Sequence, residues 1–173
     1  LMALKIENGQ IVGTIDNLED KLEGKLPIDR LELLVLVNSW GRTKSFYIFD
    51  INQDIDIDID QDIDIDIEEC EAKECYDLSK LDVSEITNMG NIFCFSNFNG
   101  NIGSWDVSKV TSMNLMFYKA ENFNSDINNW NISNVIDMYG MFNGATNFNQ
   151  NISNWNLDNV NYCDCILDNT KAF

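Results

Sequence analysis

The residues best suited to chemistry in this chain are a run of aspartates. Asp and Ile alternate over residues 54–67, which read DIDIDIDQDIDIDI. Alternate residues of an extended chain share one face, and carboxylate oxygens are the ligands that hard cations such as Ca²⁺ prefer. The spacing therefore makes seven side chains candidate calcium ligands: Asp54, Asp56, Asp58, Asp60, Asp62, Asp64 and Asp66.

Two other interpretations of this acidic ladder stay open. The aspartates could be the solvated face of an amphipathic strand whose isoleucines seal an apolar surface, or they could bind a basic protein partner. The ladder lacks the central glycine of an EF-hand loop, and every second residue is a bulky Ile. Any calcium binding is therefore expected to be weak, and no other cofactor is predicted.

The cysteines and the missing histidine limit the chemistry further. The sequence has no His, which removes the commonest general base and transition-metal ligand. A four-thiolate zinc site would need Cys70 and Cys75 to meet Cys163 and Cys165, with spacings unlike the usual knuckles. Cys70 could pair with Cys75 and close a small loop under oxidising conditions, but we favour the interpretation that they are small buried apolar residues. We predict no catalytic residues and no enzyme, although abundant acids leave a glycosidase-type carboxylate pair open.

The elements that would position the ladder are predicted from the first 53 residues. Asn8-Gly9 indicates a β-hairpin within residues 3–15, and residues 16–26 suit one short helix. Asp29 and Glu32 form a capping-box pattern, and Gly41 is a stop signal, which predicts a helix over 29–39. The Val-rich run LLVLV within it could equally be a buried strand.

The strand predicted at 45–51, SFYIFDI, has the same parity as the acidic ladder. Tyr47, Phe49 and Ile51 continue on the odd-numbered face through the isoleucines of 55–67. This predicts one long amphipathic strand, much longer than the usual five or six residues, folded or bulged near Gln61 if it is interrupted.

The second half of the chain is a repeat of about 25 residues. Three segments align at 81–104, 105–129 and 130–154, and a fourth begins at 155 and is incomplete. Equivalent slots hold Trp105, Trp130 and Trp155 in one column, and Phe98, Phe123, Phe148 and Phe173 in another. Such columns are typical of stacked interior positions, and a period of this length suits one solenoid coil.

Within each unit the pattern predicts a strand followed by a short helix. Ile152, Trp155 and Leu157 suit an extended segment, while Val135, Met138, Met141 and Phe142 have helical spacing. Ser133 or Asn134 could cap that helix and Gly144 could end it. The many asparagines are expected mainly at tight turns, or alternatively at a binding face (Asn124, Asn128, Asn129, Asn149, Asn151 and Asn154).

The columns I-x2-W-D-V-S-x-V-T-x-M-x2-M-F-x-G-A-x2-F-N resemble a bacterial surface-protein repeat found in mycoplasma, listerial and epsilonproteobacterial proteins. That repeat is similar to the BspA-like leucine-rich repeat. The resemblance covers roughly residues 78–173. It implies an α/β leucine-rich-repeat-like solenoid, a surface or interaction role, and a location at the bacterial cell surface or in the secreted fraction. It supplies no catalytic residues.

Composition agrees with an interaction protein and excludes other classes. The formal net charge is -18, and residues 50–69 hold eight Asp, two Glu and no base. A phosphate backbone needs a basic footprint, so nucleic-acid binding is disfavoured, and no apolar stretch or secretory signal predicts a membrane span or export. We predict an N-terminal cap region at 1–77 and a repeat solenoid at 78–173.

The predicted function is a non-enzymatic protein-interaction or adhesion module with a protein partner. One alternative is an acidic protein that binds calcium or a basic partner through the ladder. Another is a self-assembling solenoid, that is, a homo-oligomer formed by end-to-end stacking.

Overall fold

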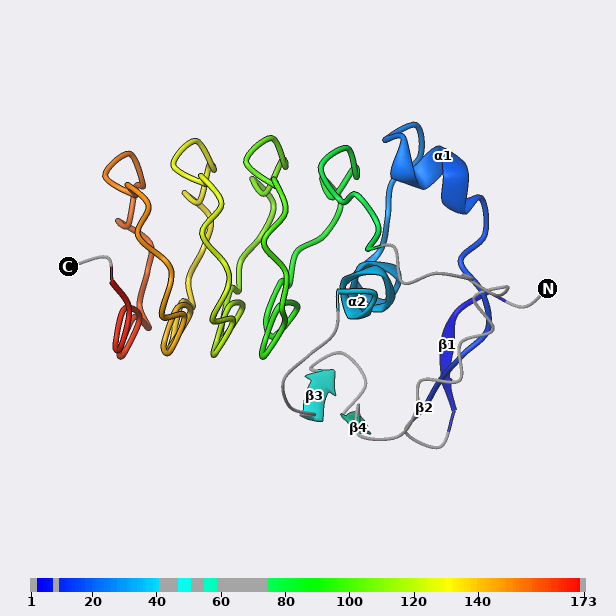
Figure 1. Cartoon of the computed structure of the whole chain (residues 1–173), viewed down its shortest axis with the longest axis horizontal. Coiled ribbons are helices and arrows are strands. Elements are labelled where there is room, and N and C mark those ends of the chain that lie inside the picture. The colour runs from blue at the N-terminus through cyan, green and yellow to red at the C-terminus, as the bar shows by residue number, and fades with distance from the viewer. Residues whose placement is uncertain (1–2, 8–9, 41–46, 51–54, 59–74, 172–173) are drawn as a thin grey trace.

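The computed structural model describes residues 3–7, 10–40, 47–50, 55–58 and 75–171. Its helices and strands all lie in the first 58 residues: β1 (Lys5–Glu7), β2 (Gln10–Val12), α1 (Leu18–Leu22), α2 (Arg30–Asn38), β3 (Tyr47–Asp50) and β4 (Ile55–Asp58). Residues 75–171 form four coils that lie side by side in a row, with α2 beside the first (Figure 1). We number these coils 1 (81–104), 2 (105–129), 3 (130–154) and 4 (from 155).

The predicted N-terminal elements are confirmed where the structure describes them. Strands β1 and β2 pair antiparallel, with Ile6 opposite Ile11 and Glu7 opposite Gln10, as the Asn8-Gly9 signal predicted. The short helix expected within 16–26 is α1, and the helix expected over 29–39 is α2. The alternative of a buried strand at LLVLV is wrong.

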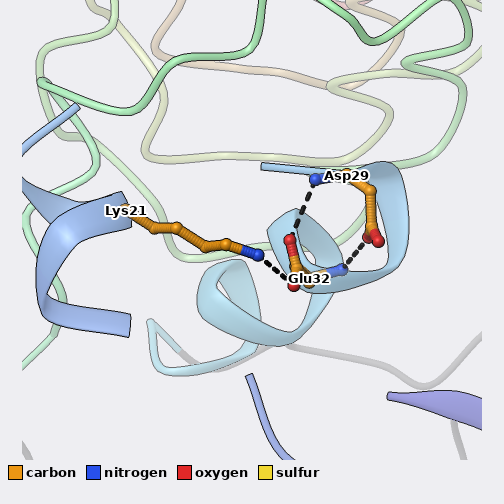
Figure 2. Close-up of polar contacts among 3 residues, drawn as sticks. All are labelled: Lys21, Asp29 and Glu32. Carbon is orange, nitrogen blue, oxygen red and sulfur yellow. Dashed lines mark hydrogen bonds and ion pairs between the residues drawn. The ribbon is translucent and has the colours of Figure 1, made fainter. Parts of the chain in front are cut away.

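Helix α2 begins with the predicted capping box. The Asp29 carboxylate accepts from the backbone N–H of Glu32 at 2.8 Å, and the Glu32 carboxylate accepts from the N–H of Asp29 at 3.0 Å. These two bonds satisfy two of the N–H groups that a helix start leaves without a partner. Lys21, at the end of α1, forms an ion pair with the same Glu32 side chain (Figure 2). The cap therefore also ties α1 to α2.

The acidic ladder does not continue β3 as one strand. Residues 55–58 form β4, which pairs antiparallel with β3, so that Tyr47 lies opposite Asp58 and Phe49 opposite Asp56. The chain therefore reverses between Asp50 and Ile55, well before Gln61, and odd-numbered residues of β3 pair with even-numbered residues of β4. The parity argument was wrong because alternation predicts an extended backbone but does not show where it turns.

The predicted fold class, a leucine-rich-repeat-like solenoid with a strand and a short helix in each coil, is contradicted. Between residues 75 and 171 the structure contains no helix and no strand. Neighbouring coils are joined there by single-residue parallel β-bridges: Asn88 to Ser112, Ser112 to Asp137, and Asp137 to Tyr162. Each coil is built from turns, and its predicted helical part is a turn segment (90–95, 114–119, 139–144 and 164–169).

Backbone hydrogen bonding explains why no helix forms. In coil 3 the N–H groups of Met141, Asn143 and Ala145 bond to the carbonyl three residues earlier. The intervening N–H groups instead donate to carbonyls of coil 4 at 2.7–2.9 Å (Met138, Gly140, Phe142 and Gly144). Every second amide is thus used between coils, so the i to i−4 bonds of an α-helix cannot form. Met138, Met141 and Phe142 are buried. Their spacing therefore predicted their burial correctly, but the helix predicted from the same spacing is wrong.

Positive φ angles make this alternation geometrically feasible. Two positions in each turn segment have φ between 53° and 75°, and in coil 3 both are glycines, Gly140 and Gly144. The equivalent residues of coil 2 are Leu115 and Lys119, for which this conformation costs about 1 kcal/mol or more. The turn geometry is therefore set by contacts with the neighbouring coil more than by local preference.

Stacked aromatic columns form the core between the coils. Phe93, Phe117 and Phe142 lie parallel, with ring centroids 5.0 and 5.5 Å apart, and Trp105 lies parallel to Trp130 at 6.5 Å. Each buried indole N–H donates to a carbonyl of the preceding turn of chain, as Trp130 does to Ile102 at 3.0 Å. The prediction that these columns are interior positions is confirmed.

Helix α2 covers the outer face of coil 1. Its residues 33–37 are all buried, which is typical of a helix enclosed on more than one side. The Arg30 guanidinium donates to the Gly90 carbonyl at 2.8 Å, and the Ile28 N–H donates to the Asp82 carbonyl at 2.9 Å. The Trp40 ring, just after α2, packs edge-on against Phe98 at 4.8 Å.

Candidate functional site

The calcium candidates lie mostly outside the described residues. Of the seven aspartates, only Asp56 and Asp58 fall in a described element, β4. The ranges that the structure describes contain no group of three or more Asp, Glu, Cys or His side chains placed to hold a metal ion. Calcium binding by the ladder therefore stays a prediction.

The described cysteines do not converge on one site. Cys163 and Cys165 are exposed free thiols in coil 4, Cys75 is exposed before coil 1, and Cys94 is buried in coil 1. A hydrogen bond to the Asp168 carboxylate raises the pKa of the Cys165 thiol, because a nearby negative charge disfavours the thiolate. Cys70, the predicted partner of Cys75, lies outside the described residues.

An open lateral groove of about 660 Å³ lies on the row of coils. It crosses all four coils and is lined by one residue of coil 1, two each of coils 2 and 3, and three of coil 4: Thr87, Lys109, Thr111, Asn134, Ile136, Asp158, Asn159 and Asn161. Hydroxyl, amide, amine and carboxylate groups therefore alternate along a shallow surface. We call this surface the lateral groove.

The polar walls of the lateral groove are fixed by contacts between coils. Asn134 donates from its side chain to the Ser108 carbonyl at 2.7 Å, and Asn159 donates in the same way to Ser133 at 2.6 Å. Lys109 pairs with Glu85 at 2.6 Å, and the hydrogen bond and charge of that carboxylate raise the pKa of the lysine. The groove is therefore lined by side chains held in place before any partner arrives.

Coils 3 and 4 carry three large exposed side chains, one of which, Ile136, lines the lateral groove. Ile136, Tyr139 and Tyr162 are 43%, 44% and 60% exposed. Tyr162 sits next to Ile136 in the stack, since its backbone N–H donates to the Ile136 carbonyl at 3.2 Å. The slot of Ile136 holds Thr87 and Thr111 in coils 1 and 2. The cluster thus replaces small polar residues with large apolar ones on the surface of coils 3 and 4, where packing does not require them.

A second, smaller hollow of about 330 Å³ lies where α1, α2 and coil 1 meet. Its lining includes Lys21, Asp29 and Glu32, which already bond to one another, together with Glu85 and Asn88. This hollow is therefore explained by the capping of α2 and is a weaker candidate.

Of the six asparagines predicted mainly at turns, one, Asn151, accepts a hydrogen bond within a turn. Asn151 accepts from the N–H of Ser153 at 2.9 Å, and the same slot in other coils holds Asp77, Asn101 and Asp126 with the same bond. Asn124 and Asn128 instead accept from backbone N–H groups of the following coil.

The sequence analysis missed a second repeat slot whose side chains bond within turns, and it missed the exposed residues Ile136, Tyr139 and Tyr162. Asp82, Asp106, Asn131 and Asn156 each accept from the N–H two residues later. The recurring D-V-S and N-I-S triplets carry that signal, because Asp and Asn bond to the backbone two residues on. The cluster could have been found as the places where Ile136 and Tyr162 depart from their columns.

The described part of the chain has no helix of the length and apolar character that a membrane crossing requires. No curated protein matches the chain, and no solved structure does. A family model described as "Mycoplasma protein of unknown function, DUF285" matches residues 62–173, which include all four coils. The BspA-like leucine-rich-repeat relationship is not confirmed, and the turn-built coils described above argue against it. With well over half of its length matched, the chain belongs to the DUF285 family of mycoplasma proteins of unknown function.

Proposed function

We propose that this chain is a non-enzymatic interaction module of a bacterial surface or secreted protein, and that it binds a protein partner through the lateral groove. The observation that carries the proposal is that Ile136, a large apolar residue that lines the groove, is exposed, with Tyr139 and Tyr162 also exposed on the same two coils. Exposed apolar patches rimmed by polar groups mark interaction sites, and tyrosine is enriched in interfaces because it offers a large surface and one polar atom.

The groove chemistry favours recognition of a polypeptide over catalysis. Amide and hydroxyl groups of Thr111, Asn159 and Asn161 can bond to a partner's backbone or side chains, while the tyrosines supply apolar area. Because Asn134 and Asn159 are already held by neighbouring coils, little side-chain entropy is lost when a partner binds.

The test compares the unaltered chain with a groove variant and a matched surface variant. Beads carrying each protein are incubated with surface extracts, and a captured protein is then purified and titrated against all three. The groove variant changes Ile136, Tyr139 and Tyr162 to Ser. The control changes Leu26, also exposed, to Ser.

We expect the groove variant to weaken binding by more than about tenfold, since each lost aromatic anchor typically costs over 1 kcal/mol. The control should bind as the unaltered chain does. Equal binding by all three proteins would contradict the proposal.

The acidic ladder supports a separate hypothesis, binding of calcium or a basic partner, for which the described residues offer no further observation. Melting the protein with and without millimolar calcium tests it, and an unchanged melting temperature would remove the calcium interpretation.

A further inference from the structure

On coils 1 to 3 the lateral groove is formed by two rows of exposed side chains that lie two residues apart in each coil. The first row is Glu85, Lys109 and Asn134, and the second is Thr87, Thr111 and Ile136. All of them line the groove except Glu85, which forms an ion pair with the groove residue Lys109. Each of these coils therefore presents one member of each row to a partner.

The backbone of the second row is already bonded between coils. The Thr111 N–H donates to the Thr87 carbonyl, and the Ile136 N–H donates to the Thr111 carbonyl, both at 2.8 Å. The Ile136 carbonyl accepts from the Asn161 N–H at 2.8 Å. Addition of a partner strand needs a backbone edge that is free to pair. The groove therefore recognises a partner through side chains.

The side chains of the groove offer mainly hydrogen-bond donors. The Asn134 amide uses one N–H on the Ser108 carbonyl and has a second. The Lys109 ammonium has two N–H groups besides the one that it donates to Glu85. The two threonines of the second row add hydroxyl groups. A ligand with many acceptors and few donors matches this set.

A proline-rich polypeptide is such a ligand. Proline has a backbone carbonyl but no N–H, and a polyproline II helix has no internal hydrogen bonds, so its carbonyls are free to accept. An α-helix instead bonds its carbonyls internally and docks through an apolar stripe. Among the described residues that line the groove, only Ile136 is apolar. The groove chemistry thus favours polyproline II over a helix.

The period of a polyproline II helix also matches the spacing of the coils. Backbones joined by N–H to carbonyl bonds lie about 4.8 Å apart, so two coil intervals span roughly 9.6 Å. A polyproline II helix has three residues per turn and rises about 3.1 Å per residue, which is roughly 9.3 Å per turn. Residues three positions apart in such a segment therefore meet coils 1 and 3 with the same face.

Carboxylates outnumber bases where the groove crosses coils 1 and 2. The hydrogen bond and charge of Glu85, with the charges of Asp106 and Asp82, raise the pKa of Lys109. Three carboxylates thus lie near one ammonium, and the Glu85 side chain is 64% exposed. A basic residue of the partner would find a complementary charge there.

We propose that the lateral groove binds a proline-rich segment in the polyproline II conformation, which places a proline on Ile136 in coil 3 and a basic residue, three positions away, beside Glu85 in coil 1. This partner chemistry rests on the function proposed above, since it specifies the kind of polypeptide that enters the groove.

The probe is a labelled synthetic peptide of six prolines with an arginine at each end. Either chain direction then places a proline three positions from an arginine. One control peptide has six glycines between the arginines, which keeps the charge and removes the fixed conformation. Another has glutamines in place of the arginines. Fluorescence anisotropy follows the binding of each peptide to the 173-residue protein at low and at physiological salt.

Three protein variants locate the binding site. Ile136→Thr gives coil 3 the residue that coils 1 and 2 have in that slot, and Glu85→Gln removes the carboxylate of the first row. The matched control is Glu121→Gln, which removes an exposed acid of coil 2 that does not line the groove. All three positions are exposed, so the variants should keep their melting temperatures.

We expect the proline peptide to bind about tenfold more tightly than the glycine peptide, because its conformation is fixed before binding. Ile136→Thr should weaken binding of the proline peptide by about fivefold through lost apolar contact. Glu85→Gln should weaken it by about threefold and reduce its salt dependence, and the glutamine peptide should bind both proteins equally weakly. Glu121→Gln should bind as the unaltered protein does.

Equal binding of the proline and glycine peptides would overturn the proposal, as would an unchanged affinity in Ile136→Thr or in Glu85→Gln. A captured protein that needs the groove but is not displaced by the proline peptide would also overturn it, and would leave the proposed function standing. Binding of the captured protein that does not depend on the groove would instead contradict the proposed function, whatever the peptides do.

Discussion

Val83 and Leu157 occupy the same slot of the repeat at opposite ends of the stack, and their side chains are 1% and 53% exposed. The first is covered by coil 2 on one side, and α2 closes that end of the stack. The second has a coil on one side only. A repeat slot therefore predicts burial only when both neighbours are present, so that exposure in this protein is decided by what lies next to a coil.

The largest expected difference is in the loss of stability when a core residue is truncated in an inner coil and in coil 4. Phe117→Ala should lower the free energy of unfolding by about 4 kcal/mol, because the ring is fully buried between Phe93 and Phe142 and leaves a cavity. Leu167→Ala, in the same slot of coil 4, should cost about 1 kcal/mol since its side chain is only partly buried. Urea unfolding measures both. Similar losses would show that coil 4 is covered in solution.

The packing of α2 over coil 1 can be weakened by removing the ion pair between Lys21 and Glu32. Glu32→Gln should cost about 2 kcal/mol, because Lys21 is left largely buried without its carboxylate. The control is Glu85→Gln, which removes the exposed partner of Lys109 and should not change stability measurably. Hydrogen exchange in α2 would show whether the loss is confined to that end. Unchanged stability in Glu32→Gln would mean that the pair does not hold the cover.

Contact between inner coils can be measured by a double-mutant cycle at one slot. Gly140 has φ +57°, and a Cβ there would lie 2.7 Å from the Leu115 side chain. Gly140→Ala should therefore destabilise the protein by about 2 kcal/mol in the unaltered chain and by about 1 kcal/mol in a Leu115→Gly background, where only the backbone cost remains. Thermal or urea unfolding of the four proteins gives the coupling. Additive effects would place the whole cost within coil 3.

The smallest expected effect is a dependence of the free energy of unfolding on pH, to which coil 2 contributes and coil 3 does not. Hydrogen bonds from Ser108 hold the pKa of Asp106 below its ordinary value. A lowered folded-state pKa adds stability above the unfolded pKa of about 3.9, and this stability is lost as pH falls through the folded-state pKa. Because Asp106 is well exposed, the change should be small.

Coil 3 supplies the matched control for this prediction, since Asn131 makes the same turn bond without a charge. Asp106→Asn should therefore keep the fold and flatten stability against pH in the acid range. Identical acid profiles for the two proteins would contradict the assignment.

Much of the core was predictable from the sequence, and the local backbone was not. The columns of Trp130, Met138 and Phe142 predicted burial correctly because stacked slots repeat at a fixed period. The same residues led to a wrong prediction of helix. Their i, i+3 and i+7 spacing shows which side chains face inward, but it does not show which backbone hydrogen bonds form. Bonds between coils use the amides that a helix would use, and in coil 3 these bonds join residues 24 positions apart, as for Met138 and Tyr162.

The N-terminal elements were predictable to the extent that their signals are local. The Asp29–Glu32 capping box and the hairpin around residues 8–9 depend on neighbours a few positions away. The pairing of β3 with β4 needed knowledge of where a uniform alternation reverses, which Ile and Asp alone do not encode. The lateral groove was not predicted because it joins residues from four repeats, and only departures from their columns indicate it.

The alternating bonds of the turn segments have an electrical consequence. Four rows of peptide groups between the coils, such as the one through the N–H groups of Asn91, Leu115 and Gly140, point their N–H toward coil 4. One row, through the N–H groups of Thr111, Ile136 and Asn161, points the other way, so most of these dipoles add along the stack. The end at coil 1 is then partly negative and the end at coil 4 partly positive. The charged side chains match this polarity, with Arg30 at the first and Asp164 and Asp168 at the second. A stack of turns without a single helix thus acquires the polarity of a helix, directed across its coils.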